Sequence, residues 1–183
     1  MKNITVFGGS HPTPIDYEQA VRLGKLLGEA SFNVLTGGYI GTMEAVSQGA
    51  AQTGVNVIGV TCSQIEAWRP AKPNAWVKEE RKYPTLRQRL FALIEQCDAA
   101  IALPGGPGTL AEIAMMWNHV IVATMPAKPI ILVGIGWKTT FDQFFQTLGE
   151  YIPIEQRNWL SFAPDVDTAV DYLLKIAQAE NCR

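Results

Sequence analysis

The chain has 183 residues, of which 48% are hydrophobic and 17% are charged, and its formal net charge is −2 at pH 7. This length predicts a single domain, residues 1–183, that buries its own apolar core. The weakly negative charge gives no reason to expect nucleic acid or an anionic membrane as a partner. No apolar run approaches the roughly 18 residues that a membrane span needs. No basic leader precedes the first predicted strand, so we expect a cytoplasmic protein.

The cysteines and histidines are few and scattered. The three cysteines, Cys62, Cys97 and Cys182, are widely spaced and are not accompanied by histidine clusters. An odd number at such spacing favours a reducing compartment over a disulfide framework or a structural zinc site. With only His11 and His119, the sequence also argues against a catalytic metal held by several histidines. We therefore expect neither a disulfide nor a metal.

Short apolar runs alternate with helical patterns along the chain. The runs that predict strands are residues 4–7, 32–35, 56–60, 99–103 and 129–133, with a short final strand at 159–162. Helical periodicity covers residues 15–30, 42–53, 84–96, 109–122, 139–149 and 165–178. Residues 61–83 form the least regular segment, and a loop of this length is often a lid over a site.

Strands that are apolar throughout and alternate with helices predict a parallel sheet with both faces covered. Right-handed crossovers then give an α/β fold that is Rossmann-like and doubly wound, with a mostly parallel sheet flanked by helices on both faces. In such sheets ligands bind beyond the carboxyl ends of the strands, where the strand order reverses. The predicted strands near residues 7, 36 and 103 all run into glycine-rich turns. We expect these turns to meet in one crevice.

The turn at residues 104–109, Pro-Gly-Gly-Pro-Gly-Thr, is the most informative of the three. Its glycines leave backbone N–H groups uncovered at the start of a helix, where partial positive charge favours a phosphate. Glu112 follows within the first turns of that helix, beside the place that the rest of a phosphorylated ligand would occupy. The turn matches neither the Walker A pattern nor the dinucleotide fingerprint G-x-G-x-x-G. It therefore predicts a phosphate site next to an acid.

Three candidate residues also have a purely structural interpretation. Thr109 and Glu112 have the spacing of a capping box, in which the threonine caps the helix and the glutamate bonds back to its backbone. Spacing supports capping and catalysis equally, and the two roles can coexist. Arg89 flanks the apolar stripe of helix 84–96, where an arginine usually packs its stem on the core and leaves its head in water. Periodicity does not decide between that arrangement and a site role.

Three motifs together resemble the LOG (LONELY GUY) family, whose members were long mislabelled as possible lysine decarboxylases. The family pattern P-G-G-x-G-T-x-x-E is found at residues 104–112, G-G-x-x-G-x-M at 37–43 and V-F-x-G-S at 6–10. The catalytic arginine of the family lies fifteen positions before the proline of the first pattern, at Arg89. Members with an assigned function hydrolyse nucleoside 5′-monophosphates, including cytokinin forms, to free base and ribose 5-phosphate.

The resemblance implies that Arg89 and Glu112 form the catalytic pair. It implies an AMP-like or N6-substituted AMP substrate, no metal and no cofactor, and a homodimer in which the second subunit helps to close the site. It also implies that the glycine-rich turns bind the substrate and its phosphate through Ser10, Gly37, Gly38, Gly41, Gly105, Gly106, Gly108 and Thr109.

The chain departs from the family pattern at positions that bear on the substrate. Leu90 follows Arg89 where the family often has lysine, and Tyr39 and Glu44 replace glycines of the cytokinin-activating members. The identity of the base therefore stays open. A non-catalytic sensor of nucleotides or phosphosugars would use the same turns and is the alternative hypothesis. An NAD-type binding module is a third, although residues 8–10 lack the remaining glycine of that fingerprint.

Overall fold

The computed structural model describes residues 2–181. The strands are β1 (Asn3–Phe7), β2 (Asn33–Thr36), β3 (Val57–Cys62), β4 (Glu79–Tyr83), β5 (Ala99–Ala102), β6 (Ile130–Val133) and β7 (Leu160–Ala163). The helices are α1 (Pro14–Glu29), α2 (Thr42–Ala51), α3 (Ser63–Trp68), α4 (Leu86–Glu95), α5 (Pro107–Ile121), α6 (Ile135–Leu148), α7 (Ile154–Arg157) and α8 (Val166–Asn181), with a 3₁₀ turn at Gly149–Tyr151. Cys62 and Cys97 are buried free thiols, whereas Cys182 lies outside the described residues.

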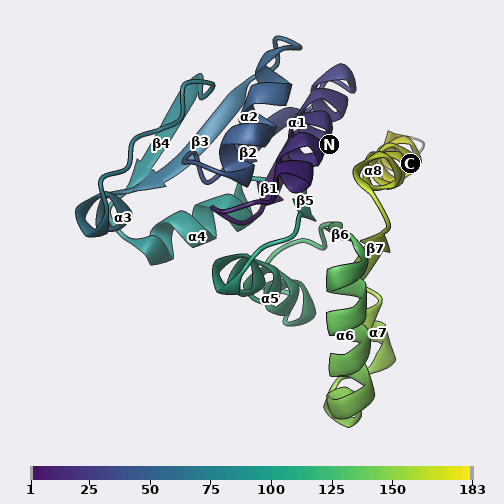
Figure 1. The fold of residues 1–183 in the computed structure, drawn as a ribbon. Coiled ribbons are helices and arrows are strands. Elements are labelled where there is room, and N and C mark those ends of the chain that lie inside the picture. Colours follow the sequence, from purple (N-terminus) through teal and green to yellow (C-terminus); the bar gives the residue numbers. More distant parts are fainter. Residues whose placement is uncertain (1, 182–183) are drawn as a thin grey trace.

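The seven strands run parallel in one sheet, in the order β4-β3-β2-β1-β5-β6-β7 (Figure 1). The chain moves outward from β1 to β4 and then crosses back to β5 on the other side of β1. The strand order therefore reverses between β1 and β5, as in other doubly wound sheets. The predicted fold class is confirmed, and this topology places a ligand crevice at the carboxyl ends of β1 and β5.

Helices cover both faces of the sheet. One face packs against α1, α2 and α8, and the other against α4, α5 and α6 (Figure 1). Because side chains alternate along a strand, Ile4 and Val6 enter the first core while Phe7 enters the second. Burial on both faces is the reason that these strands are apolar throughout. Among the described residues, no helix is long and apolar enough to cross a membrane.

The expectation of a long irregular loop at residues 61–83 was wrong, because this segment contains α3 and the strand β4. Strand β4 has the sequence Glu-Glu-Arg-Lys-Tyr and pairs with β3 at the edge of the sheet. Its side chains alternate between half-buried and exposed positions. An edge strand has one neighbour and tolerates charged residues, so β4 does not have the apolar pattern of the other strands.

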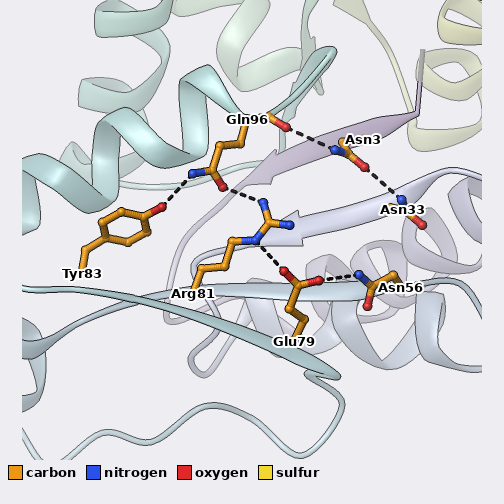
Figure 2. Close-up of polar contacts among 7 residues, drawn as sticks. All are labelled: Asn3, Asn33, Asn56, Glu79, Arg81, Tyr83 and Gln96. Atoms are coloured by element: carbon orange, nitrogen blue, oxygen red, sulfur yellow. Dashed lines mark hydrogen bonds and ion pairs between the residues drawn. The ribbon is translucent and has the colours of Figure 1, made fainter.

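Polar side chains fix β4 to the rest of the molecule at the amino ends of the strands (Figure 2). The Glu79 carboxylate accepts hydrogen bonds from Asn56 Nδ2 and Arg81 Nε, each at 2.7 Å. These contacts hold the pKa of Glu79 below its usual range. Arg81 Nη1 also donates to Gln96 Oε1 at 2.7 Å, and Gln96 Nε2 donates to the Tyr83 hydroxyl at 2.7 Å. The crevice is predicted at the carboxyl ends of the strands, so this network lies away from it, and we interpret it as structural.

Candidate active site

A cavity of about 250 Å³ lies where the glycine-rich turns meet. The turn after β1 contacts both of the others, since Gly9 N donates to the Pro104 carbonyl at 3.3 Å and Thr42 N donates to the Gly9 carbonyl at 3.0 Å. The expected convergence of three turns is therefore present. The cavity is lined by Gly8, Gly9, Ser10, Tyr39, Met43, Ile65, Arg69, Arg89, Gly106, Pro107, Gly108, Thr109 and Glu112.

The amino end of α5 forms one wall of this cavity. Gly106 is the N-cap residue, Pro107 is the first helical residue, and no described side chain caps the helix. Its first backbone N–H groups are consequently available to a ligand. A Cβ atom on Gly106 or Gly108 would meet no atom within 4 Å, so the helix start is also open sterically. Together with the partial positive charge of a helix amino end, this arrangement suits a phosphate.

The capping-box interpretation of Thr109 and Glu112 was wrong. Because α5 begins at Pro107 rather than after Thr109, the threonine is the third helical residue and is buried. Within the described part of the chain, Thr109 and Glu112 make no hydrogen bond to each other. Proline at the first helical position needs no N–H partner and has a helical φ in advance, which explains the earlier start. Glu112 is therefore not used to cap the helix.

Glu112 faces Arg89 in a part of the cavity that is largely shielded from solvent. Their side chains are 14% and 9% exposed, and Glu112 Oε1 lies 3.9 Å from Arg89 Nη1, too far for a hydrogen bond. Burial raises the pKa of Glu112 to about 7, although the positive charge of Arg89 partly opposes the shift. A carboxyl group with this pKa exchanges its proton near neutral pH, as a general acid or base must.

Arg89 is buried and held by the backbone, so the alternative of a solvated flanking arginine was wrong. Its Nε donates to the Val60 carbonyl at 2.8 Å and its Nη2 donates to the Gly37 carbonyl at 3.3 Å. The guanidinium carbon also lies 5.8 Å from the centroid of the Tyr39 ring. These contacts to β3 and to the end of β2 hold the Arg89 guanidinium beside Glu112.

Six of the ten predicted site residues line the cavity, namely Ser10, Arg89, Gly106, Gly108, Thr109 and Glu112. The other four are glycines that shape its walls. A Cβ on Gly37 would overlap Arg89 Nη2, and one on Gly105 would overlap the Thr109 side chain. Gly38 and Gly41 have a φ of +78°, and a Cβ on Gly41 would overlap the Ser10 backbone. These glycines permit close approach of the turns.

Replacing Gly37 with alanine is expected to displace Arg89, because the new Cβ would overlap both Arg89 Nη2 and Met43 Sδ. Overpacking of this kind typically lowers the free energy of unfolding by about 1–3 kcal/mol. Urea denaturation of Gly37→Ala measures the loss. The matched control is Gly136→Ala on α6, where a Cβ meets no atom within 4 Å. Equal, small losses in the two variants would show that Gly37 does not make room for Arg89.

Ile65 and Arg69 line the cavity but were not found from the sequence. Both belong to the segment that was interpreted as an irregular loop, where no periodicity assigns a direction to a side chain. The tryptophans Trp68, which is 80% exposed, and Trp76 are the features of this segment that could indicate contact with a base. Arg69 stacks on the Trp68 ring, with its guanidinium carbon 5.6 Å from the ring centroid. Tyr39, in the turn after β2, and Met43, near the start of α2, also line the cavity.

Comparison with known proteins identifies the family of the chain. The model of the SLOG cluster4 family (LDcluster4) matches residues 1–150. A probable cytokinin riboside 5′-monophosphate phosphoribohydrolase, LOGL3, of Oryza sativa subsp. japonica is 38% identical over 180 residues, covering 94% of this chain and 83% of the relative. The pyrimidine/purine nucleotide 5′-monophosphate nucleosidase of Escherichia coli (strain K12) is 30% identical over 156 residues, which are 81% of this chain. The match spans 34% of that nucleosidase, about a third of its length.

A solved structure of similar shape is the molybdenum cofactor binding protein of Rippkaea orientalis, with a TM-score of 0.77 and 24% identity over 96% of this chain and 97% of that one. At this identity the likeness supports the fold alone. The family model and the relative LOGL3 also support a family assignment, because both matches extend over most of the chain and include the turns that form the cavity. The chain therefore belongs to the LOG family and matches the SLOG cluster4 family model.

Proposed function

We propose that this protein hydrolyses the N-glycosidic bond of a nucleoside 5′-monophosphate and releases free base and ribose 5-phosphate. The observation that carries the proposal is the position of Glu112, a buried carboxyl group with a pKa of about 7, in the same cavity as the uncapped start of α5. Glu112 is the sixth residue of the helix, so it lies roughly 8 Å along the axis at 1.5 Å per residue. A phosphate at the helix start would thus place the ribose beside Glu112.

The reaction needs a group that stabilises the positive charge that develops on the sugar. When the bond between C1′ and the base breaks, its electron pair leaves with the base and C1′ gains oxocarbenium character. The ionised Glu112 carboxylate can stabilise that charge and accept a proton from the water that attacks C1′. The proton then passes to the departing base. Arg89 positions the carboxylate, and the phosphate contacts at α5 fix the sugar against it. This scheme uses no metal and no cofactor.

The pH dependence of the reaction follows from the raised pKa of Glu112. Since the ionised form is the active one, kcat/KM is expected to rise with pH until about pH 7 and then level off. Well below pH 7 the loss approaches tenfold for each pH unit. Initial rates at low substrate concentration, measured across this range, test the prediction. A profile that is flat through pH 7, or that falls as the pH rises through it, contradicts a role for the carboxylate as base.

The experiment that tests the proposed function is a screen of nucleotides. Purified protein is incubated with AMP, GMP, CMP, UMP and an N6-substituted AMP, and free base is measured by chromatography. Release from at least one nucleotide, lost in Glu112→Gln, is the expected result. Thermal stabilisation by a nucleotide without release would instead support the non-catalytic sensor. Neither release nor stabilisation would overturn the proposal.

We further propose that the active form is a cytoplasmic homodimer of this single nucleotide-binding domain. The family resemblance supports a dimer, as do the exposed apolar side chains Leu86 on α4 and Leu110 on α5, which lie on the two helices that carry Arg89 and Glu112. The single sheet supports one domain. The free thiols Cys62 and Cys97 fit a reducing compartment. A monomeric mass by light scattering at micromolar concentration would contradict the dimer, and recovery of the native protein outside the cytoplasm would contradict the compartment.

A further inference from the structure

Arg69 has a polar atom that the protein leaves without a partner. Its Nε atom is buried and makes no hydrogen bond with any described residue, although the side chain lines the cavity. Its backbone is fixed at the end of α3, where Arg69 N donates to the Ile65 carbonyl at 2.9 Å. A buried donor without a partner is destabilising and rare in folded proteins. An acceptor supplied by the ligand would satisfy it.

Arg69 and the phosphate turn enter the cavity from different strands of the sheet. It follows β3 and α3 along the chain, whereas the phosphate turn follows β5. In the sheet order β3-β2-β1-β5, strands β3 and β5 are three strand spacings apart, which is about 14 Å at 4.8 Å per spacing. Arg89 is hydrogen-bonded to Val60 of β3 and to Gly37 after β2, and its neighbour Glu112 lies on α5, so this pair links the two sides of the cavity. A nucleotide with its phosphate at α5 and its ribose at Glu112 therefore extends its base toward Arg69.

Apart from Arg89 Nη1, which faces Glu112, the other groups at this end have little free hydrogen-bonding capacity. Met43 and Ile65 are apolar lining residues. The Tyr39 hydroxyl accepts a hydrogen bond from Cys62 N at 2.8 Å and donates to the Cys62 carbonyl at 3.2 Å. Arg89 uses Nε and Nη2 on backbone carbonyls. Among the described residues, Arg69 is thus the polar side chain best placed to contact the base.

We propose that Arg69 is a specificity-determining residue that selects a 6-oxopurine base, as in GMP, over adenine. A guanidinium group carries donors only, and its Nε–H and one Nη–H form a parallel pair. The matching edge of a base presents two adjacent acceptors, which guanine does with O6 and N7. Adenine presents an amino donor beside N7 and leaves one guanidinium donor unpaired. AMP remains within the proposed substrate class, with GMP ranked above it. The orientation of the base rests on the proposed function.

The test compares kcat/KM for GMP and AMP in the wild-type protein, Arg69→Met and Arg69→Lys. The wild-type protein is expected to prefer GMP, and Arg69→Met is expected to lose on the order of 10- to 100-fold for GMP, chiefly through KM, with little change for AMP. Lysine should restore only part of this loss, because it replaces a two-donor fork with a point charge. The control is Arg87→Met, since Arg87 is exposed on α4 and stacks on Phe91, 5.8 Å from its ring centroid.

Equilibrium binding separates this inference from the proposed hydrolysis. Calorimetry with GMP, AMP and CMP on Glu112→Gln, with and without Arg69→Met, requires no turnover. If the wild-type protein releases no base but binds GMP more tightly than AMP through Arg69, the hydrolase proposal fails and the role of Arg69 stands. The inference is overturned if Arg69→Met loses affinity equally for GMP and AMP, or loses none for either. It is also overturned if GMP does not bind, or if Arg69 instead confers a preference for CMP.

Discussion

Replacing Glu112 with glutamine is expected to lower kcat by a factor on the order of 10³, because the amide can neither accept a proton from water nor offset charge at C1′. Glutamine has nearly the same shape, so the cavity and the nucleotide affinity should be preserved. Release of base by the variant under single-turnover conditions measures the loss. Glu112 is the only carboxylate among the described residues that line the cavity, and it lies beside Arg89. Retention of more than about a tenth of the wild-type kcat would remove Glu112 from the proposed mechanism.

The same substitution is expected to stabilise the free protein at alkaline pH. The pKa of Glu112 is raised from 4.5 to about 7 on folding, so between these values the folded state binds more protons than the unfolded state. Stability contributed by the protonated carboxyl is present below the unfolded pKa and is lost as the pH rises through the folded one. Above pH 7 the buried charge costs about 1–3 kcal/mol. Glu112→Gln should therefore unfold at a higher temperature than the wild-type protein near pH 8, and at a similar temperature near pH 5.

Replacing Arg89 with methionine is expected to impair both stability and catalysis. The Val60 and Gly37 carbonyls lose their buried donors, which should lower the free energy of unfolding by about 3 kcal/mol. Glu112 loses the positive charge that partly opposes its raised pKa. The pH at which kcat/KM levels off should accordingly move above 7, and kcat/KM at neutral pH should fall on the order of 100-fold.

Urea denaturation and the pH profile of Arg89→Met check these two expectations separately. The exposed Arg87, on the same helix, provides the control, and Arg87→Met should change neither. If Arg89→Met loses stability while its pH profile and its rate stay as in the wild-type protein, Arg89 is a structural residue and not a positioning residue for Glu112.

The fold and the phosphate turn could be predicted from the sequence because their signals are local. Strands such as β1 and β5 are apolar throughout since both faces are covered, and glycines mark the turns that follow them. Strand β4 was missed because it lies at the edge of the sheet and is polar, with partners such as Asn56 and Gln96 that come from distant parts of the chain.

The errors at the site have related physical causes. The spacing of Thr109 and Glu112 satisfied a capping motif, but Pro107 starts the helix before it. Periodicity placed Arg89 at the flank of its helix, yet the long side chain turns inward because backbone carbonyls at the ends of two strands accept its hydrogen bonds. Arg69 enters the cavity through the placement of α3 beyond β3, which no short-range pattern encodes.

The central claim is tested most directly by identifying the products formed from GMP and AMP. The wild-type protein should yield free base and ribose 5-phosphate in equal amounts, and Glu112→Gln should yield neither. Formation of nucleoside and inorganic phosphate instead, or equal base release by the wild-type protein and Glu112→Gln, would contradict cleavage of the N-glycosidic bond at this cavity.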